Sequence, residues 1–198
     1  MMRKILVVVG ILIIGLTVFN YEALSSYIPS LFSGQNSFGQ TQLLRRNTSQ
    51  ENSTFEFEFH GSAMEPNYKN RSWCISDASF YQSSLPIRGD VILFIGTSGT
   101  GEEIQLVKRI IGLPTERIMI RDNKVYINGS LLMEPYLSPT ISTSAVGAKF
   151  MTEGIELTIP TNDYFLLGDN RPHSSDSREF GFIAKESILG KIISCRTP

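Results

Sequence analysis

One lysine lies inside an apolar segment, residues 105–111, where it could act as a base. Successive residues of a strand point to opposite faces, so Lys108 would share one face with Leu106 and Ile110. Burial among aliphatic side chains disfavours the ammonium form, and a neutral lysine can accept a proton during catalysis. The alternative is a lysine on a solvent-facing edge of a sheet. The pattern therefore predicts either a general base or a solvated cation.

A second cluster of reactive side chains occupies residues 168–181, directly after an apolar run at 164–167. It contains two Asp, two Arg and three Ser between two bracketing Gly. So many hydrogen-bonding groups after a buried strand predict an ordered loop. Asp176 and Arg178 are close enough in sequence to form an ion pair that holds this loop in shape.

A third cluster spans residues 60–68, where we expect a strand to give way to a turn at Glu65-Pro66. A Ser/His/Asp triad could also be drawn from His60 or His173 with Asp90 or Asp169, but nothing in the sequence places these residues together. Two polar histidines without a catalytic role are the simpler interpretation.

The two cysteines, Cys74 and Cys195, could be free thiols or form a disulfide. Cys74 lies between Trp73 and Ile75, an apolar setting that predicts an inert buried thiol instead of a nucleophile. Cys74 and Cys195 could form a disulfide in an oxidising compartment or remain two separate buried thiols, and the sequence leaves both open.

The segments that must position these clusters have the patterns of strands. Residues 55–59 alternate strictly between Phe and Glu, as a half-buried strand does. Short apolar runs with turn-forming residues at their ends predict further strands. These strands are expected at 91–95, 105–111, 117–120, 124–127, 164–167 and 188–193. Asp122-Asn123 and Asn128-Gly129 predict tight turns. After residue 24 no helical periodicity is evident, apart from a turn near residues 184–187, so we expect a mainly antiparallel β domain.

The N-terminal segment predicts a membrane anchor. Residues 5–19 carry no charge and follow Arg3 and Lys4. About twenty apolar residues cross a bilayer, and flanking positive charges favour the cytoplasm. A cleavable signal peptide is the alternative, but no A-x-A-like cleavage site follows. We expect a cytoplasmic tip and transmembrane anchor at 1–24, a polar linker at 25–54, and a domain at 55–198 outside the plasma membrane.

Composition excludes several other classes of protein. The chain has 198 residues and a formal net charge of -1, which removes the electrostatic reason to expect nucleic acid as a partner. Two cysteines exclude a disulfide-dense scaffold. With 41% hydrophobic and 19% charged residues, the chain is not disordered as a whole.

Four motifs together resemble the type I signal peptidases in order and spacing, at residues 61–66, 88–92, 107–114 and 168–181. The resemblance covers about residues 55–195 and the N-terminal anchor. It implies a mainly β fold with a small inserted β subdomain at about 115–159. It also implies a Ser/Lys dyad that removes signal peptides from exported preproteins at the outer face of the membrane, without metal or nucleotide cofactors.

The resemblance also assigns roles to individual residues. Lys108 corresponds to the general base, and Ser174 to the serine whose hydroxyl orients that lysine. The supporting positions are Asp169 in the same loop, the Asp176/Arg178 ion pair, and Met64 and Pro66 after the nucleophile.

The sequence departs from the family at the nucleophile itself, because Ala63 stands immediately before Met64 where the family has serine. Alanine has no hydroxyl to attack a carbonyl, although the N–H of residue 63 could still donate to an oxyanion. We therefore expect this chain to be inactive, either as an engineered serine-to-alanine knockout or as a naturally inactive homologue. Ser62 is the alternative nucleophile, but a strand through residues 62 and 63 would point Ser62 away from Lys108.

A binding function without catalysis is the alternative to an enzyme. Without a nucleophile, the domain could still hold an extended peptide along a strand edge. It would then be a membrane-anchored binding module or a partner of an active signal peptidase.

Overall fold

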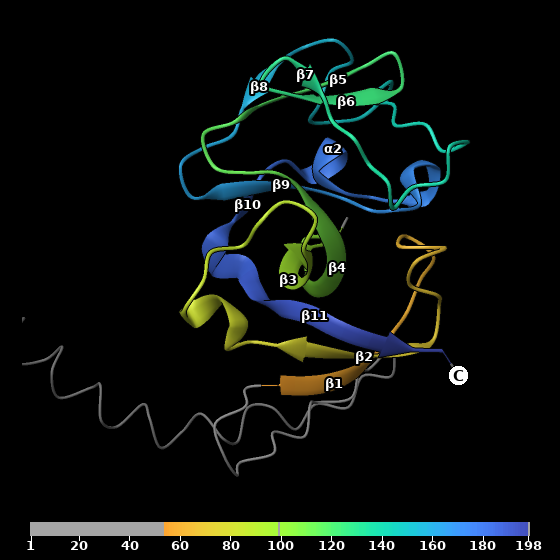
Figure 1. Ribbon diagram of the computed structural model, residues 1–198, viewed down its shortest axis with the longest axis vertical. Coiled ribbons are helices and arrows are strands. Elements are labelled where there is room, and N and C mark those ends of the chain that lie inside the picture. Colours follow the sequence, from red (N-terminus) through yellow and green to blue (C-terminus); the bar gives the residue numbers. More distant parts are fainter. Residues whose placement is uncertain (1–53, 99, 198) are drawn as a thin grey trace, which may run out of the picture. The chain divides into compact units, whose positions relative to one another are not determined.

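The computed structural model describes residues 54–98 and 100–197, which form two antiparallel β-sheets (Figure 1). The larger sheet has seven strands in the order β1-β2-β11-β3-β4-β9-β10. Its strands are β1 (Thr54–Phe59), β2 (Ser72–Asp77), β3 (Val91–Thr97), β4 (Glu103–Gly112), β9 (Asp163–Leu167), β10 (Ile183–Ala184) and β11 (Ile188–Arg196). The predicted mainly antiparallel β fold is confirmed, and so are the strands expected in this sheet.

The smaller sheet has four strands in the order β7-β6-β5-β8, and all of them lie between residues 117 and 158. They are β5 (Arg117–Arg121), β6 (Lys124–Ile127), β7 (Ser130–Leu131) and β8 (Leu157–Thr158). The two expected turns are present. Asp122 and Asn123 both have positive φ, at 52° and 61°, which matches the twist of the flanking strands.

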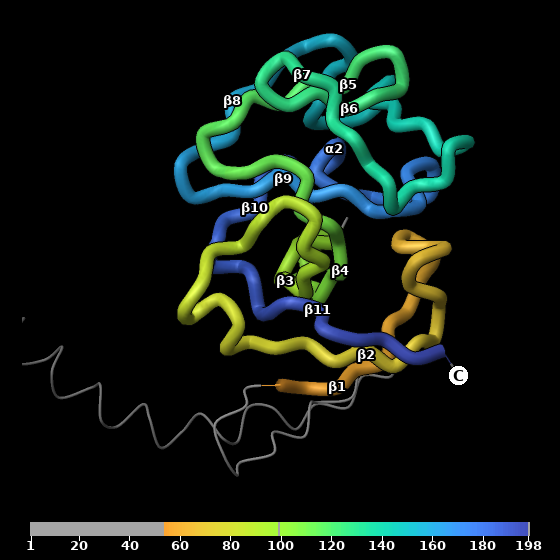
Figure 2. The backbone as a smooth tube through the Cα atoms, viewed as in Figure 1, coloured from red at the N-terminus to blue at the C-terminus, as the bar shows by residue number. Residues whose placement is uncertain are grey.

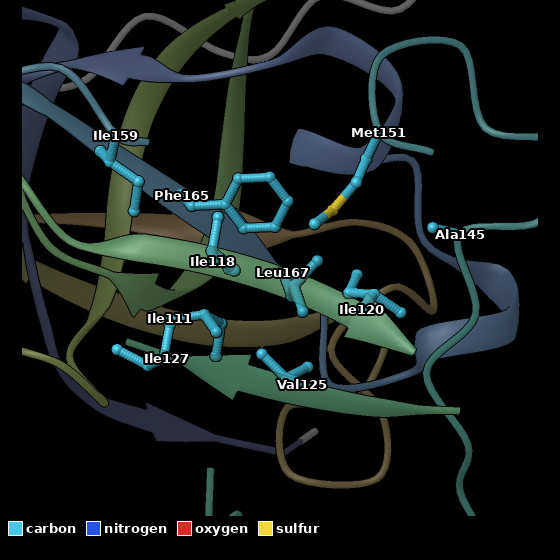
Figure 3. Packing of buried hydrophobic residues seen from close by; sticks show 10 residues of the cluster. All are labelled: Ile111, Ile118, Ile120, Val125, Ile127, Ala145, Met151, Ile159, Phe165 and Leu167. Carbon is cyan, nitrogen blue, oxygen red and sulfur yellow. The ribbon is translucent and has the colours of Figure 1, made fainter. Parts of the chain in front are cut away.

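One apolar cluster joins the smaller sheet to strands β4 and β9 (Figure 3). Ile118, Ile120 and Val125 project from the smaller sheet, and they meet Phe165 and Leu167 of β9. Two further clusters pack on strands β3 and β4, one around Val91 and Val107 and the other around Ile92 and Ile110. Strand β4 is therefore buried on both faces, which is the setting that places Lys108 among apolar side chains.

Helical structure in the described residues is limited to single turns. The turn expected near residues 184–187 is the 3-10 helix η4 (Lys185–Ser187), and two others are η2 (Phe80–Gln82) and η3 (Arg171–His173). The short helix α2 (Ser177–Phe180) was not expected, because four residues are too few for a periodic pattern. It is specified instead by its cap, since the Asp176 carboxylate accepts a hydrogen bond from the Arg178 N–H.

The two cysteines form a disulfide between β2 and β11. Cys74 lies directly opposite Cys195 in the register of these antiparallel strands. The expectation of an inert buried thiol at Cys74 is therefore wrong, and of the two alternatives left open the structure has the disulfide. Strand register brings the sulfurs together although the two cysteines are 121 positions apart in the sequence.

The predicted anchor and the linker up to residue 53 lie outside the described residues. Within residues 54–98 and 100–197, no helix is both long enough and apolar enough to cross a membrane.

Candidate active site

Position 63 lies in the connection between β1 and β2, which leaves the sheet and rises towards the loop that follows β9 (Figure 2). Strand β1 ends at Phe59, earlier than expected, and residues 62–67 form a compact turn. The Glu65 N–H donates to the Ser62 carbonyl at 3.1 Å, and the Tyr68 N–H donates to the Met64 carbonyl at 3.0 Å. Strand alternation therefore does not govern Ser62 and Ala63, and that argument for the direction of Ser62 is wrong.

Burial differs along this turn. Met64 is fully buried and packs in the cluster around Val91 and Val107. Ala63 is half-buried and Ser62 is exposed. The buried methionine fixes the turn to the core from one side, while residue 63 stays accessible to a ligand.

The loop after β9 holds the turn at its start. Asn170 donates two hydrogen bonds to successive carbonyls, from its backbone N–H to Ala63 at 3.0 Å and from its side-chain amide to Ser62 at 3.0 Å. Gly168 lies against the same carbonyl, because a β-carbon on it would come within 2.5 Å of the Ala63 oxygen. The absence of a side chain at residue 168 lets the loop and the turn make contact.

Lys108 is only 3% exposed, so of the two alternatives that the strand pattern left open the structure has the buried lysine. Its Nζ donates to the Val107 carbonyl at 3.2 Å. Burial lowers the pKa of the Lys108 amine below its usual 10.5, and the negative charge of Asp176 partly opposes that shift. A larger share of neutral amine is therefore available near neutral pH than for an exposed lysine.

The strand register brings Lys108 to the same place. Arg109 pairs with Leu167 across β4 and β9, so continuing the register by one residue sets Lys108 opposite Gly168. Gly168 therefore marks the point where strand β4, the loop and the turn at position 63 converge.

Ser174 also lies against Gly168. A β-carbon on Gly168 would clash with both the Oγ and the Cβ of Ser174. The Ser174 Oγ is buried, and it has no hydrogen-bond partner among the described residues. A buried hydroxyl without a partner is costly, so this oxygen is available to a group that enters the site.

Asp176 and Arg178 form the predicted ion pair, with 2.8 Å between Arg178 Nε and Asp176 Oδ1. Asp176 is fully buried, and its other oxygen accepts a hydrogen bond from the Gly168 N–H at 3.1 Å. Arg178 also donates to the carbonyls of Arg171 and Ser174. The pair thus fixes both ends of the segment that carries Ser174.

Asp169 supports the site by binding Arg109, a residue to which the sequence analysis assigned no role. The Arg109 guanidinium binds it in a bidentate pair, with nitrogen–oxygen distances of 2.8 and 2.6 Å. Asn67 donates to the same carboxylate at 2.8 Å. Adjacent Lys108 and Arg109 thus have different tasks, because one is desolvated and the other is neutralised. The contacts of Asn67 and Asn170 span about a hundred residues, and no local pattern signals them.

The possible triad residues do not meet. His60 and His173 are exposed. Asp90 binds Lys191 and Tyr81, and Asp169 binds Arg109, so neither carboxylate is engaged with a histidine. In the part of the chain that the structure describes, no three His, Cys, Asp or Glu side chains gather as metal ligands do.

Comparisons with known proteins bear on the same segments. Residues 51–196 match the family model described as signal peptidase, peptidase S26. Signal peptidase I V of Bacillus subtilis is 33% identical over 142 residues, which cover 69% of this chain and 82% of that protein. Signal peptidase I of Bacillus licheniformis is 38% identical over 105 residues, which cover 52% of this chain and 55% of that protein.

A solved structure is also similar. The crystal structure of a signal peptidase I from Enterococcus faecalis V583 has 36% sequence identity and a TM-score of 0.44, and the match covers 55% of this chain and 97% of that chain. The family model spans the turn at Ala63, the Lys108 strand and the loop from Gly168, so this chain belongs to the signal peptidase family, peptidase S26.

Proposed function

We propose that this domain is built to cleave signal peptides from exported preproteins with a Ser/Lys dyad, and that Ala63 leaves the present chain without its nucleophile. The observation that carries the proposal is Lys108, which is buried, has a lowered pKa and precedes Arg109, whose partner Leu167 leads into Gly168, where the Ala63 turn and Ser174 meet. A neutral amine there can take a proton from a hydroxyl at residue 63.

The roles of the other residues follow from this assignment. The Ser174 Oγ, which has no partner among the described residues, is assigned the task of orienting the lysine amine in the working enzyme, and the Asp176/Arg178 pair holds Ser174 in place. The residue 63 N–H stabilises the oxyanion of the tetrahedral intermediate. The domain acts on the outer face of the plasma membrane, where residues 5–21 anchor it.

The experiment compares the present chain with Ala63→Ser on a preprotein that carries an A-x-A cleavage site. We expect the present chain to leave the preprotein intact and Ala63→Ser to release the mature protein. Efficient cleavage by the present chain would show that another residue is the nucleophile.

A binding function is the second candidate. It is favoured by the half-buried Ala63 beside an unpartnered, buried Ser174 hydroxyl, because a peptide could occupy this place without being cut. Retention of the preprotein by the present chain, together with an inactive but folded Ala63→Ser, would support this module over the enzyme.

A further inference from the structure

Residues 134–136 connect the smaller sheet to the active site, although no catalytic motif includes them. Tyr136 makes three polar contacts there. Its carbonyl accepts a hydrogen bond from the Asn67 amide at 2.9 Å, and its ring lies 4.1 Å from the Arg109 guanidinium. Its hydroxyl donates to Glu134 at 2.6 Å.

Two of the residues that Tyr136 touches, Asn67 and Arg109, share a partner. Asn67 belongs to the turn that carries position 63, Arg109 follows Lys108 on β4, and both bind the Asp169 carboxylate. Asn67, Arg109, Asp169 and Tyr136 therefore form a closed circuit of contacts, which we call the Tyr136 junction. A closed circuit restrains relative motion more than a single bond does, because its members must all move together.

Glu134 extends the junction to Arg171, two residues after Asp169 in the loop that follows β9. Its carboxylate binds Arg171, whose side chain is fully buried and which also contacts the Thr143 hydroxyl. The Arg171 Nε donates to the Gly168 carbonyl at 3.0 Å. Tyr136 thus contacts Asn67, in the turn of residue 63, and Arg109, next to Lys108, while Glu134 contacts Arg171, which binds Gly168 beside Ser174.

We propose that Tyr136 is a positioning residue, which holds the turn at residue 63 in register with the Lys108 strand. This inference rests on the proposed function. Tyr136 touches none of the reacting groups, and it acts through Asn67 and Arg109. The connection that follows β7 then has a role in catalysis, since it supplies the residue that holds nucleophile and base in register.

The kinetic test uses Ala63→Ser as the parent enzyme. Small displacements of reacting groups are costly, so we expect Tyr136→Ala to lower kcat by about 10- to 100-fold with little change in KM. Tyr136→Phe keeps the ring over Arg109 and loses only the hydroxyl contact with Glu134, so it should keep kcat within about threefold of the parent. The matched control is Leu132→Ala, because Leu132 lies in the same connection and packs on the same apolar cluster but does not belong to the junction.

A second measurement needs no activity. In the present chain, amide hydrogen exchange reports the turn through the N–H groups of Glu65 and Tyr68 and the loop through that of Asn170. Tyr136→Ala should accelerate exchange at these three amides, whereas Leu132→Ala should not. Asn67→Ala removes the other half of the junction, its hydrogen bonds to the Tyr136 carbonyl and to Asp169, from an exposed position, so it tests the junction if Tyr136→Ala fails to fold.

The outcomes separate the two proposals. If Ala63→Ser fails to cleave, the proposed function is wrong, while the exchange data still decide the role of Tyr136. Unchanged exchange at the three amides, or equal losses of kcat in Tyr136→Ala and Leu132→Ala, would overturn the inference about Tyr136.

Discussion

Gly168 lies so close to Ala63 that a β-carbon on residue 168 would come within 2.5 Å of the Ala63 carbonyl oxygen. On the other side, the same β-carbon would come within 2.5 Å of the Ser174 Cβ. The obstacles are a backbone atom and a buried side chain near its root, and neither can rotate away. The close approach of the loop to the Ala63 turn therefore depends on the missing side chain of one glycine.

Gly168→Ala should separate the loop from the turn. Overpacking of this kind costs typically about 1–3 kcal/mol, and we expect urea unfolding to show a loss of that size. The control is Gly96→Ala, where the nearest atom, at 2.8 Å, is the tip of the Leu106 side chain, which can move. Equal losses in the two variants would argue against a tight contact at Gly168.

Replacing Lys108 with methionine should stabilise the fold, and the gain should shrink as pH rises. The folded pKa of Lys108 is lowered from 10.5, so between the folded and unfolded pKa values the unfolded chain binds a proton that the folded chain lacks. Stability of the parent therefore rises with pH across that window, by about 1.4 kcal/mol per pH unit from this group. Lys108→Met has no such dependence.

Urea unfolding of both proteins at several pH values between 6 and 10.5 measures the difference directly. Other groups titrate alike in the two chains, so they cancel. A difference in unfolding free energy that stays constant with pH would contradict the lowered pKa of Lys108.

Breaking the disulfide should weaken the attachment of the β1–β2 hairpin. Within the described residues, that hairpin joins the rest of the larger sheet through β11 alone, and the disulfide crosses this pairing at Cys74 and Cys195. It closes a loop of 121 residues, and such cross-links contribute about 2–5 kcal/mol. Reductant should lower the unfolding midpoint of the parent, and it should leave the Cys74→Ala/Cys195→Ala variant unchanged.

Local patterns predicted the strands and the tight turns well. The Phe/Glu alternation at 55–59 and the Asp122-Asn123 turn each specify their conformation within a few residues, so no distant partner is needed. The burial of Lys108 was also predictable, because its strand neighbours are aliphatic.

Long-range contacts could not be predicted in the same way. Cys74 and Cys195 meet through strand register, and Asn170 reaches Ser62 across 108 residues, so neither pairing leaves a local signal. The strand premise used for the direction of Ser62 failed for a related reason, while that direction itself stays a prediction. The alternation of β1 ends at Phe59, where the chain leaves the sheet to contact the loop at Gly168.

The most direct prediction concerns the nucleophile, and it is that Ala63→Ser gives signal peptidase activity that depends on Lys108. Residue 63 is half-buried, so one added hydroxyl meets little steric resistance. Cleavage should increase as pH rises through the lowered pKa of Lys108, because only the neutral amine can accept the serine proton. Preprotein processing followed by gel electrophoresis across a pH series measures both effects.

Two further variants identify the reacting groups. Ala63→Ser combined with Lys108→Ala should be as inactive as the present chain, because the base is gone while the hydroxyl remains. Ser62→Ala in the Ala63→Ser enzyme should leave cleavage unchanged, since the exposed Ser62 hydroxyl takes no part. If Ser62→Ala instead abolishes cleavage in a folded protein, the nucleophile is Ser62, and Lys108 must serve the residue before the one proposed.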